Sequence, residues 1–315
     1  MVLQGDTLWI GSLNGLYTYQ LKSRQLNHFD SKQTGLPHNT IYSIIHTKDN
    51  QIYIGTYNGL CRYVQASGKF ENILLPVNRG GSNLFVNSLL EDAARQCIWI
   101  GMEGYLFQYN PTTGEMKAIE VFHNNSIKSL ALDGDENLLA GTDNGLYVYQ
   151  NDKEPLQHII HDSRNIQSLT NNIIWNIFSD QEHNIWLGTD YGISLSRYNS
   201  ALQFVPISQI TGTGDGNQFY SLFRDSKGFY WFGGTNGLIR FTDPAGDKHN
   251  AIWYRMGDKT YPLSHNRIRH IYEDKEQQLW IATDGSINRY DYATRQFVHY
   301  NIVDSTGTYK SPASE

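Results

Sequence analysis

The chain has 315 residues, of which 39% are hydrophobic and 13% aromatic, and its formal net charge is −6. A chain of this length can bury a core large enough to fold without a disulfide framework or a structural metal. Its basic residues are scattered and it has no run of 18 apolar residues, which excludes a basic nucleic-acid-binding face and a membrane-spanning helix within this sequence.

A short apolar block followed by Gly recurs along the chain. It reads LWIGS, IYIGT, IWIGM, LLAGT, IWLGT, YWFGG and LWIAT, and its fourth residue is Gly11, Gly55, Gly101, Gly141, Gly188, Gly233 and Ala282. The spacing averages about 45 residues, the period of propeller blades, whereas helical repeats such as the tetratricopeptide unit have about 34. We therefore predict seven copies of one structural unit.

Each copy predicts four short strands in the same order. The first strand follows an Asn, at Asn39, Asn125, Asn172, Asn217 and Asn266. An Asp eight residues later, at 133, 180, 225 and 274, is expected to open a turn by accepting hydrogen bonds from its own backbone. The apolar block is the second strand, and the Asn-Gly pairs at 14–15, 58–59, 144–145 and 236–237 predict type I′ hairpins into the third.

This pattern predicts an all-β, seven-bladed β-propeller of four-stranded repeats over residues 1–300. A four-stranded sheet has two apolar faces, and radial packing of seven sheets buries each face against a neighbour. Five tryptophans share one repeat position and are expected in the core between blades, namely Trp9, Trp99, Trp186, Trp231 and Trp280.

The two ends of the chain do not fit the repeat. The first copy lacks an Asn-led strand because the chain starts only eight residues before Trp9, so we expect an incomplete first blade. Residues 301–315 are expected to be a C-terminal tail or a partial blade strand. We expect a sequence cut from a longer protein, and an alternative is that it takes blades from two neighbouring propellers.

Candidate ligand-binding residues lie in the loops at one end of the predicted blades, where a rigid scaffold usually carries them. Sugar recognition needs flat aromatic faces and planar polar groups, and an anionic sugar would add Arg. The candidates are Tyr57, Tyr105, Trp175, Asp190, Tyr191, Arg267, Arg269 and Asp284. Trp175 is the most suggestive, because other copies have Tyr42, Lys128, Tyr220 and Arg269 at that position. Packing and turn formation are the alternative roles, and the repeated Asn residues are interpreted as caps.

No catalytic or metal-binding constellation is evident in the sequence. The eleven histidines are scattered and form no HExxH motif. Asp225-Ser226-Lys227-Gly228 has the spacing D-x-x-G, whereas the sialidase Asp box needs D-x-G. Cys61 and Cys97 are expected to be buried strand residues. We predict a non-enzymatic chain without cofactor or metal, with a carbohydrate-active hydrolase or lyase as an alternative.

Two stretches, GLPHNTIYSIIHTKDNQIYIGTYNGLCRY (35–63) and NQFYSLFRDSKGFYWFGGTNGLIRF (217–241), resemble the regulator-propeller repeat of hybrid two-component sensors from polysaccharide-degrading gut bacteria. A third stretch, NRIRHIYEDKEQQLWIATDGSINRYD (266–291), is similar to a late blade of the same sensors. The likeness covers essentially residues 5–300. It implies a periplasmic region of two propellers followed by an immunoglobulin-like domain, a transmembrane helix, a histidine kinase, a receiver and a DNA-binding regulator.

Only the propeller part of that arrangement is matched by this sequence, so a role in phosphotransfer rests on analogy. The resemblance implies a periplasmic module that binds an oligosaccharide and relays a conformational signal to a kinase outside this chain. The expected partners are the ligand and the other domains of the parent sensor. A protein-interaction or dimerisation scaffold, including a homodimer, is an alternative, because a face rich in Tyr suits a protein contact.

Overall fold

The computed structural model describes residues 1–77, 84–119, 125–150, 153–198, 204–206, 218–242, 251–260 and 262–300. The predicted tail at 301–315 lies outside the described residues. Seven sheets of four strands each are present in these ranges, which confirms the all-β, seven-bladed β-propeller. The chain divides into two compact units, Met1–Leu130 and Ala131–Glu315.

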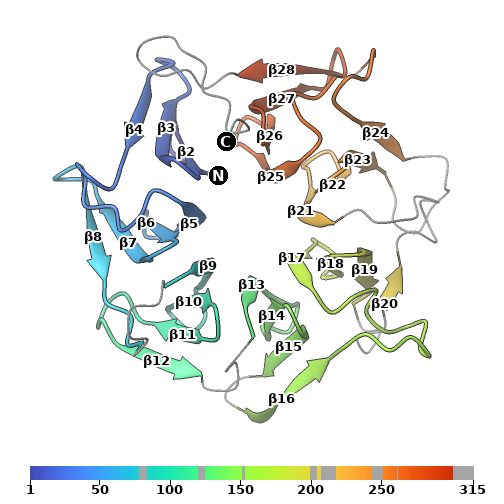
Figure 1. The fold of residues 1–315 in the computed structure, drawn as a ribbon, viewed down its shortest axis with the longest axis horizontal. Helices are drawn as coiled ribbons and strands as arrows, with labels where there is room; N and C mark the ends of the chain where they lie inside the picture. Colours follow the sequence, from blue (N-terminus) through green and yellow to red (C-terminus); the bar gives the residue numbers. More distant parts are fainter. Residues whose placement is uncertain are drawn as a thin grey trace. The chain divides into compact units, whose positions relative to one another are not determined.

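The first unit contains blades 1 to 3 (Figure 1). Blade 1 consists of β1 (Val2–Gln4), β2 (Thr7–Ser12), β3 (Gly15–Gln20) and β4 (Leu26–Phe29), and blade 2 of β5 (Ile41–His46), β6 (Ile52–Thr56), β7 (Gly59–Val64) and β8 (Lys69–Ile73). Blade 3 consists of β9 (Val86–Asp92), β10 (Cys97–Met102), β11 (Leu106–Tyr109) and β12 (Met116–Ile119).

The second unit contains blades 5 to 7 and most of blade 4, whose first strand, β13 (Ile127–Leu132), begins before the boundary at residue 130. Blade 4 continues with β14 (Leu138–Thr142), β15 (Gly145–Gln150) and β16 (Lys153–Ile159), and blade 5 consists of β17 (Ile174–Ser179), β18 (Ile185–Thr189), β19 (Gly192–Ser196) and β20 (Phe204–Pro206). Blade 6 consists of β21 (Phe219–Arg224), β22 (Tyr230–Gly234), β23 (Gly237–Phe241) and β24 (Ile252–Tyr254), and blade 7 of β25 (Ile268–Glu273), β26 (Leu279–Thr283), β27 (Ile287–Asp291) and β28 (Gln296–Tyr300).

The expectation of an incomplete first blade was wrong. Val2–Gln4 forms a three-residue strand that pairs antiparallel with β2, so blade 1 also has four strands. No Asn leads this strand, and it is half as long as β5, its six-residue counterpart in blade 2. Each residue of an antiparallel strand pairs with one residue of its neighbour, so three residues can form a short ladder with β2.

The tryptophans of the second strands are buried, as predicted. Trp9, Trp99, Trp186, Trp231 and Trp280 are at most 3% exposed. The ring centroid of Trp186 in β18 lies 4.9 Å from that of Tyr230, in β22 of the next blade. In the first unit the ring centroid of Trp9 in β2 lies 4.8 Å from that of Tyr63, in β7 of blade 2. The indoles of Trp9 and Trp186 therefore lie in the core between neighbouring blades of their units, where large aromatic side chains bury the most apolar area.

The Asp that follows the first strand fixes both a turn and the adjacent indole. Asp180 accepts hydrogen bonds from the backbone N–H groups of Glu182 and Asn184, which confirms the predicted turn. The same carboxylate accepts a 2.8 Å bond from Nε1 of Trp186. Equivalent bonds join Trp99 to Asp92, Trp231 to Asp225 and Trp280 to Asp274. A buried indole N–H without an acceptor would cost about 1–3 kcal/mol, so each Asp makes burial of its Trp possible.

The Gly of the repeated block is required because the next blade approaches closely. A Cβ atom at Gly11 would lie 2.6 Å from Cγ2 of Ile41, and one at Gly233 would lie 2.4 Å from Cγ2 of Ile268. Both Ile residues begin the first strand of the following blade. Only a residue without Cβ fits at such a distance, so the Gly allows consecutive blades to pack.

The Asn-Gly hairpins differ from the predicted type I′ turns. In blade 2 Thr56 pairs with Gly59, so the two turn residues are Tyr57 and Asn58. Gly59 has a φ of 118°, whereas neither turn residue has a positive φ. This is the pattern of a hairpin in which a Gly follows the turn as a bulge residue. This register places the residue before Asn, here Tyr57, at the tip of the hairpin.

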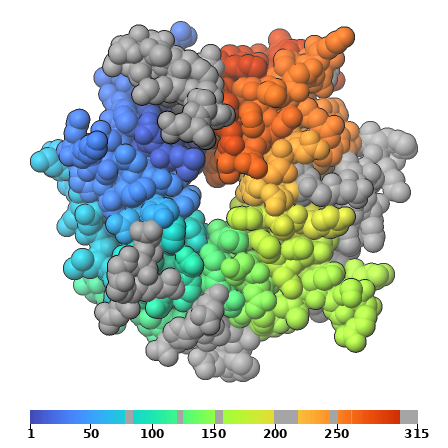
Figure 2. All heavy atoms as spheres, viewed as in Figure 1, coloured from blue at the N-terminus to red at the C-terminus, as the bar shows by residue number. Residues whose placement is uncertain are grey.

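The first strands of the second unit form one edge of the packed blades (Figure 1). In this view β17, β21 and β25 lie next to one another, and β20, β24 and β28 lie at the opposite ends of their sheets. Figure 2 shows the described atoms of these blades, coloured yellow-green to red, packed closely against one another. Side chains at the ends of the three first strands can therefore meet.

Candidate ligand-binding site

A β-bulge occurs at the same position of the first strand in several blades. In blade 5 Ile174 pairs with Thr189 and Asn176 with Gly188, so Trp175 is the extra residue of the bulge. The bulge residues of blades 2, 3, 5, 6 and 7 are Tyr42, Asn87, Trp175, Tyr220 and Arg269. Bulges re-aim a side chain and are common next to functional sites. The position at which Trp175 departs from the repeat pattern is therefore a structurally distinct one.

Two bulge residues from neighbouring blades, Trp175 and Tyr220, are connected through Asp190. Nε1 of Trp175 donates a 3.0 Å hydrogen bond to Oδ1 of Asp190, and Nε2 of Gln218 donates a 2.6 Å bond to the same oxygen. The Tyr220 hydroxyl donates to Oε1 of Gln218. The two aromatic rings meet edge to face, with centroids 5.4 Å apart. Blades 5 and 6 thus present a pair of rings beside a carboxylate.

Blade 7 adds a charged group to this pair. Nε and Nη2 of Arg269 donate hydrogen bonds of 2.5 and 3.1 Å to the two carboxylate oxygens of Asp284. Nη1 of Arg267 lies 3.8 Å from Oδ2 of the same carboxylate. The guanidinium carbon of Arg269 also lies 5.9 Å from the ring centroid of Tyr220. We name the connected residues the bulge cluster, which consists of Trp175, Asp190, Gln218, Tyr220, Arg267, Arg269 and Asp284.

The hairpin that carries Asp190 is held rigidly by its own backbone and by a threonine. The hydroxyl of Thr189 donates a 2.9 Å bond to the carbonyl of Gly192 and accepts a bond from the backbone N–H of Tyr191. The backbone N–H of Asp190 donates to the carbonyl of Ile173 in the preceding connection. The corresponding hairpin of blade 7 is held in the same way. Rigid support of this kind keeps binding groups in place before a ligand arrives.

The bulge cluster is accessible to solvent and has both apolar and polar groups. The side chains of Arg267 and Arg269 are 45% and 49% exposed, and that of Asp284 is 25% exposed. Burial raises the pKa of Tyr220, although the two Arg residues nearby act in the opposite direction. The Tyr220 hydroxyl therefore remains a hydrogen-bond donor at neutral pH. Two aromatic rings with planar polar groups around them can hold a hydroxylated ligand.

The structure brings five of the eight predicted site residues into the bulge cluster, Trp175, Asp190, Arg267, Arg269 and Asp284. A sixth, Tyr191, follows Asp190 on the same hairpin, and its side chain is 56% exposed. Tyr57 and Tyr105 lie in the first unit, outside the cluster. The ring of Tyr105 stacks on that of Phe107, with centroids 5.8 Å apart.

Gln218 and Tyr220 are the members of the bulge cluster that the list of predicted site residues lacks. Tyr220 has the same repeat position as Trp175, so treating that position as a bulge would have selected it from the sequence. No sequence signal distinguishes Gln218, because its role depends on Asp190, 28 residues earlier in the chain.

The first unit has a different group of aromatic rings at the equivalent end of blade 2. Tyr57 contacts His38 and Phe85, with ring centroids 4.8 and 4.4 Å apart. The bulge residue Tyr42, which is 44% exposed, lies 6.4 Å from Tyr57 by the same measure. We name His38, Tyr42, Tyr57 and Phe85 the aromatic group.

Asn39 and Asn172, which precede first strands, act as caps, as predicted, whereas the predicted cap Asn217 lies outside the described residues. Oδ1 of Asn39 accepts a hydrogen bond from the backbone N–H of Ser31, and Oδ1 of Asn172 accepts one from His161. The carbonyl of Asn172 also accepts a 2.7 Å bond from the backbone N–H of Gly145 in blade 4. These bonds tie the connection between blades to the preceding hairpin, so the repeated Asn residues serve the fold.

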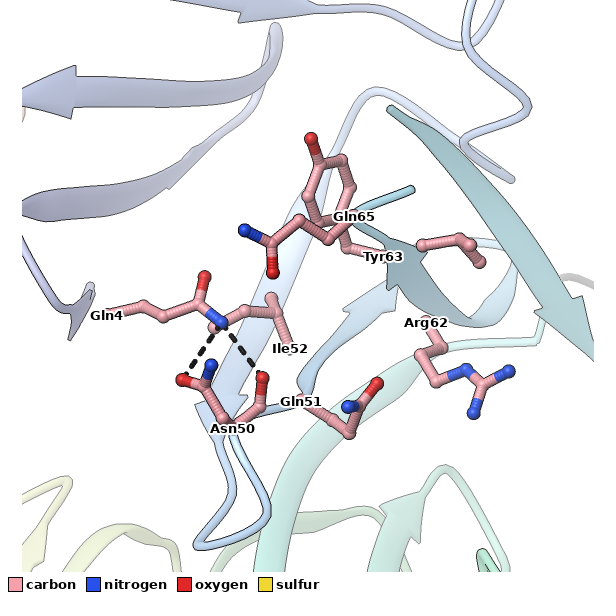
Figure 3. A pocket seen from close by; sticks show the side chains of 8 residues that line it. Gln4, Asn50, Gln51, Ile52, Arg62, Tyr63 and Gln65 are labelled. Carbon is pink, nitrogen blue, oxygen red and sulfur yellow. Dashed lines mark hydrogen bonds between the residues drawn. The ribbon is translucent and has the colours of Figure 1, made fainter. Parts of the chain in front are cut away.

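A cavity of about 170 Å³ lies in the first unit, between blades 1 and 2 (Figure 3). Its lining residues are Gln4, Asn50, Gln51, Ile52, Arg62, Tyr63, Val64 and Gln65. Nε2 of Gln4 donates to both oxygens of Asn50, and Arg62 pairs with Glu71 at 2.6 Å. Gln4, Asn50 and Arg62 are thus engaged in polar contacts already, and none of the predicted site residues lines the cavity.

The described residues contain no features of a metal site, a membrane-spanning helix or a reactive thiol. No group of three His, Cys, Asp or Glu side chains there could hold a metal ion. No helix in those ranges is long and apolar enough to cross a bilayer. Cys61 and Cys97 are buried, and burial raises the pKa of both thiols, so neither is a ready nucleophile. Asp225, whose D-x-x-G spacing differs from that of the Asp box, accepts hydrogen bonds from the Trp231 indole and from the backbone of its own turn.

The repeats that carry the bulge cluster match a known family. The family described as two component regulator propeller matches residues 35–58, 168–191, 213–236 and 262–285. Each matched stretch ends within a hairpin and contains one bulge residue, namely Tyr42, Trp175, Tyr220 or Arg269. The chain therefore carries two-component regulator propeller repeats.

The chain is also similar to individual proteins of two-component systems. The chain is 84% identical to the extracellular domain of BT4673 from B. thetaiotaomicron, whose two solved structures are described as belonging to a proposed one-component and a proposed hybrid two-component system. The TM-scores are 0.61 and 0.62, with 96% and 98% of this chain and 41% of the other covered. The chain is also 26% identical to Histidine kinase P4 of Formosa agariphila, over 92% of this chain and 22% of that protein. It thus spans less than half of either relative.

A more distant solved structure shows the fold alone. PorZ, a surface component of the type-IX secretion system of Porphyromonas gingivalis, has a TM-score of 0.70 at 14% identity, with 90% of this chain and 45% of that protein covered.

Proposed function

We propose that this chain is the ligand-sensing propeller part of an extracellular, periplasmic sensor domain of a hybrid two-component system, and that the bulge cluster binds an oligosaccharide. The observation that carries this proposal is the contact between blades 5 and 6, where the rings of Trp175 and Tyr220 meet beside Asp190. The identity of 84% to an extracellular domain of such a system supports the cellular role. The recipient of the signal would be a histidine kinase elsewhere in the parent protein.

The position of the bulge cluster suits a sensor. Its residues come from three consecutive blades of one unit, so a ligand that contacts all of them would favour one relative position of those blades. A ligand can shift a conformational equilibrium only through such differential contacts. The proposed site therefore offers a direct route from binding to a change in blade packing.

Calorimetric titration with oligosaccharides from digested polysaccharides tests this function. We expect saturable heat with at least one digest and no new product by chromatography. The Trp175→Ala variant should bind that ligand at least tenfold more weakly, which corresponds to about 1.4 kcal/mol. Unchanged affinity in a variant that gives the wild-type circular dichroism spectrum would remove the bulge cluster from the site.

A second function, a dimerisation scaffold, is favoured by the aromatic group of the first unit. Tyr42 is 44% exposed among three further rings, and Tyr is enriched in protein interfaces. Analytical ultracentrifugation distinguishes the two functions. The scaffold function would be supported by two results. The protein would form a dimer that Tyr42→Ser abolishes, and the oligosaccharide titrations would give no binding heat.

A further inference from the structure

The charges of the bulge cluster are already balanced within the cluster. Arg269 is engaged by both oxygens of Asp284, and Arg267 lies 3.8 Å from the same carboxylate. Asp190 receives its two side-chain hydrogen bonds from an indole and a carboxamide, both of which are neutral donors. The cluster therefore contains two carboxylates and two guanidinium groups, and its formal charge is zero, but both guanidinium groups lie at Asp284.

The two carboxylates differ in what surrounds them. Asp284 is covered by the guanidinium groups of blade 7, whereas Asp190 has no Lys or Arg within ion-pair distance among the residues that the structure describes. The contacts run from Asp190 to the ring of Trp175 and from that ring to the ring of Tyr220. Tyr220 in turn lies near Arg269, which pairs with Asp284. A ligand on the rings would thus meet an uncompensated negative charge on the side of blade 5.

These charges bear on which ligand the cluster can take. An anionic ligand would be repelled by Asp190. It could pair through Nε and Nη2 of Arg269 only by displacing Asp284, because those two groups already donate to that carboxylate. Repulsion of this kind is a common source of specificity, because like charges brought together cost several kcal/mol. A neutral hydroxyl group can instead donate to Asp190 while the apolar face of a sugar ring rests on the aromatic side chains.

We propose that the bulge cluster selects neutral saccharides over uronic or sulfated ones, and that Asp284 sets this preference by occupying both arginines. The inference rests on the proposed function and adds the chemical class of the ligand. It also reverses what the sequence suggests, since Arg267 and Arg269 by themselves point to an anionic sugar. In this scheme Asp284 determines specificity indirectly, because its pairing with the two arginines decides whether they can bind an anion.

The test uses matched ligands and two variants of this chain. A panel of neutral oligosaccharides is titrated beside the same compounds oxidised at C6, in which each CH₂OH has become a carboxylate. We expect the wild type to bind the neutral member of a pair at least tenfold more tightly. Asp284→Asn keeps the shape of the side chain and frees both arginines, so the ratio of the two affinities should move toward the anionic member by at least tenfold.

Asp162→Asn is the matched control, because Asp162 pairs with Arg164 on the surface outside the bulge cluster. This variant should leave the ratio unchanged. Tighter binding of the oxidised member by the wild type, or an unchanged ratio in Asp284→Asn, would overturn the inference and leave the proposed function standing. Failure of every saccharide to bind the wild type would overturn the proposed function and the inference with it.

Discussion

The indole of Trp175 and the carboxylate of Asp190 are joined by a 3.0 Å hydrogen bond although 15 residues separate them. Trp175 is a bulge residue of the first strand, and Asp190 occupies the tip of the hairpin between the second and third strands. The bond orients the ring and leaves the carboxylate at its edge. The pair is the smallest part of the bulge cluster that can be tested by itself.

Trp175→Phe retains an aromatic ring but removes the N–H that donates to Asp190. We expect oligosaccharide binding to weaken about three- to tenfold, since one hydrogen bond to a charged group is lost at a partly exposed site. Calorimetry of the variant beside Trp253→Phe provides the comparison, because Trp253 lies in β24 outside the bulge cluster. Equal effects of the two substitutions would contradict a special role for Trp175.

Asp225→Ala should strongly destabilise blade 6. Its carboxylate accepts hydrogen bonds from Nε1 of Trp231 and from the hydroxyl of Tyr292, 2.7 Å each. Both donors would be left without this acceptor in a buried region, so we expect the free energy of unfolding to fall by about 3 kcal/mol or more. Denaturant titration measures this loss.

Asp133→Ala is the matched control for that experiment. Asp133 accepts turn bonds from the backbone of Asp135 and Asn137, but blade 4 has Leu139 where blade 6 has Trp231. We expect a loss of only about 1 kcal/mol. A loss as large as that of Asp225→Ala would show that the turn, and not the indole bond, provides the stability.

Gly233→Ala should prevent close packing between blades 6 and 7. The new Cβ would lie 2.4 Å from Cγ2 of Ile268, and a shift of one strand would cost about 2–3 kcal/mol. Gly114→Ala is a useful comparison, because Gly114 has a φ of 75° but open space around it. That variant should lose about 1 kcal/mol through backbone strain alone. Similar unfolding free energies for the two variants would argue against the close approach.

The contribution of Asp92 to stability should depend on pH. Burial acts to raise the pKa of this carboxyl, but hydrogen bonds from Trp99 and Arg95 outweigh it and hold the pKa below its ordinary value of 3.8. A lowered pKa in the folded state means that the contribution is complete above about pH 4 and is lost as the pH falls through the folded value. The difference in unfolding free energy between wild type and Asp92→Asn should therefore be larger at pH 7 than at pH 3. An equal difference at both pH values would contradict this assignment.

Much of the fold could be predicted because it depends on contacts that every copy of the repeat makes. The indole of Trp186, the turn at Asp180 and the cap at Asn172 each recur at fixed spacing, so the period alone reveals them. The type of hairpin could not be predicted from Asn-Gly, because the strand register moved the turn one residue earlier and left Gly59 after it. The short strand β1 was missed because it lacks the Asn that marks the others.

The sequence by itself determined the seven-fold repeat, the buried indoles and the kinds of side chain near the hairpin tips, because these follow from spacing within one copy. Only the tertiary structure decided which of those side chains meet. Gln218 reaches Asp190 from the next blade, and Arg269 turns to Asp284 and not to a ligand. The physical reason is that a bulge and its neighbours are set by packing between blades, and so is the pairing of charges that decides what the site can bind.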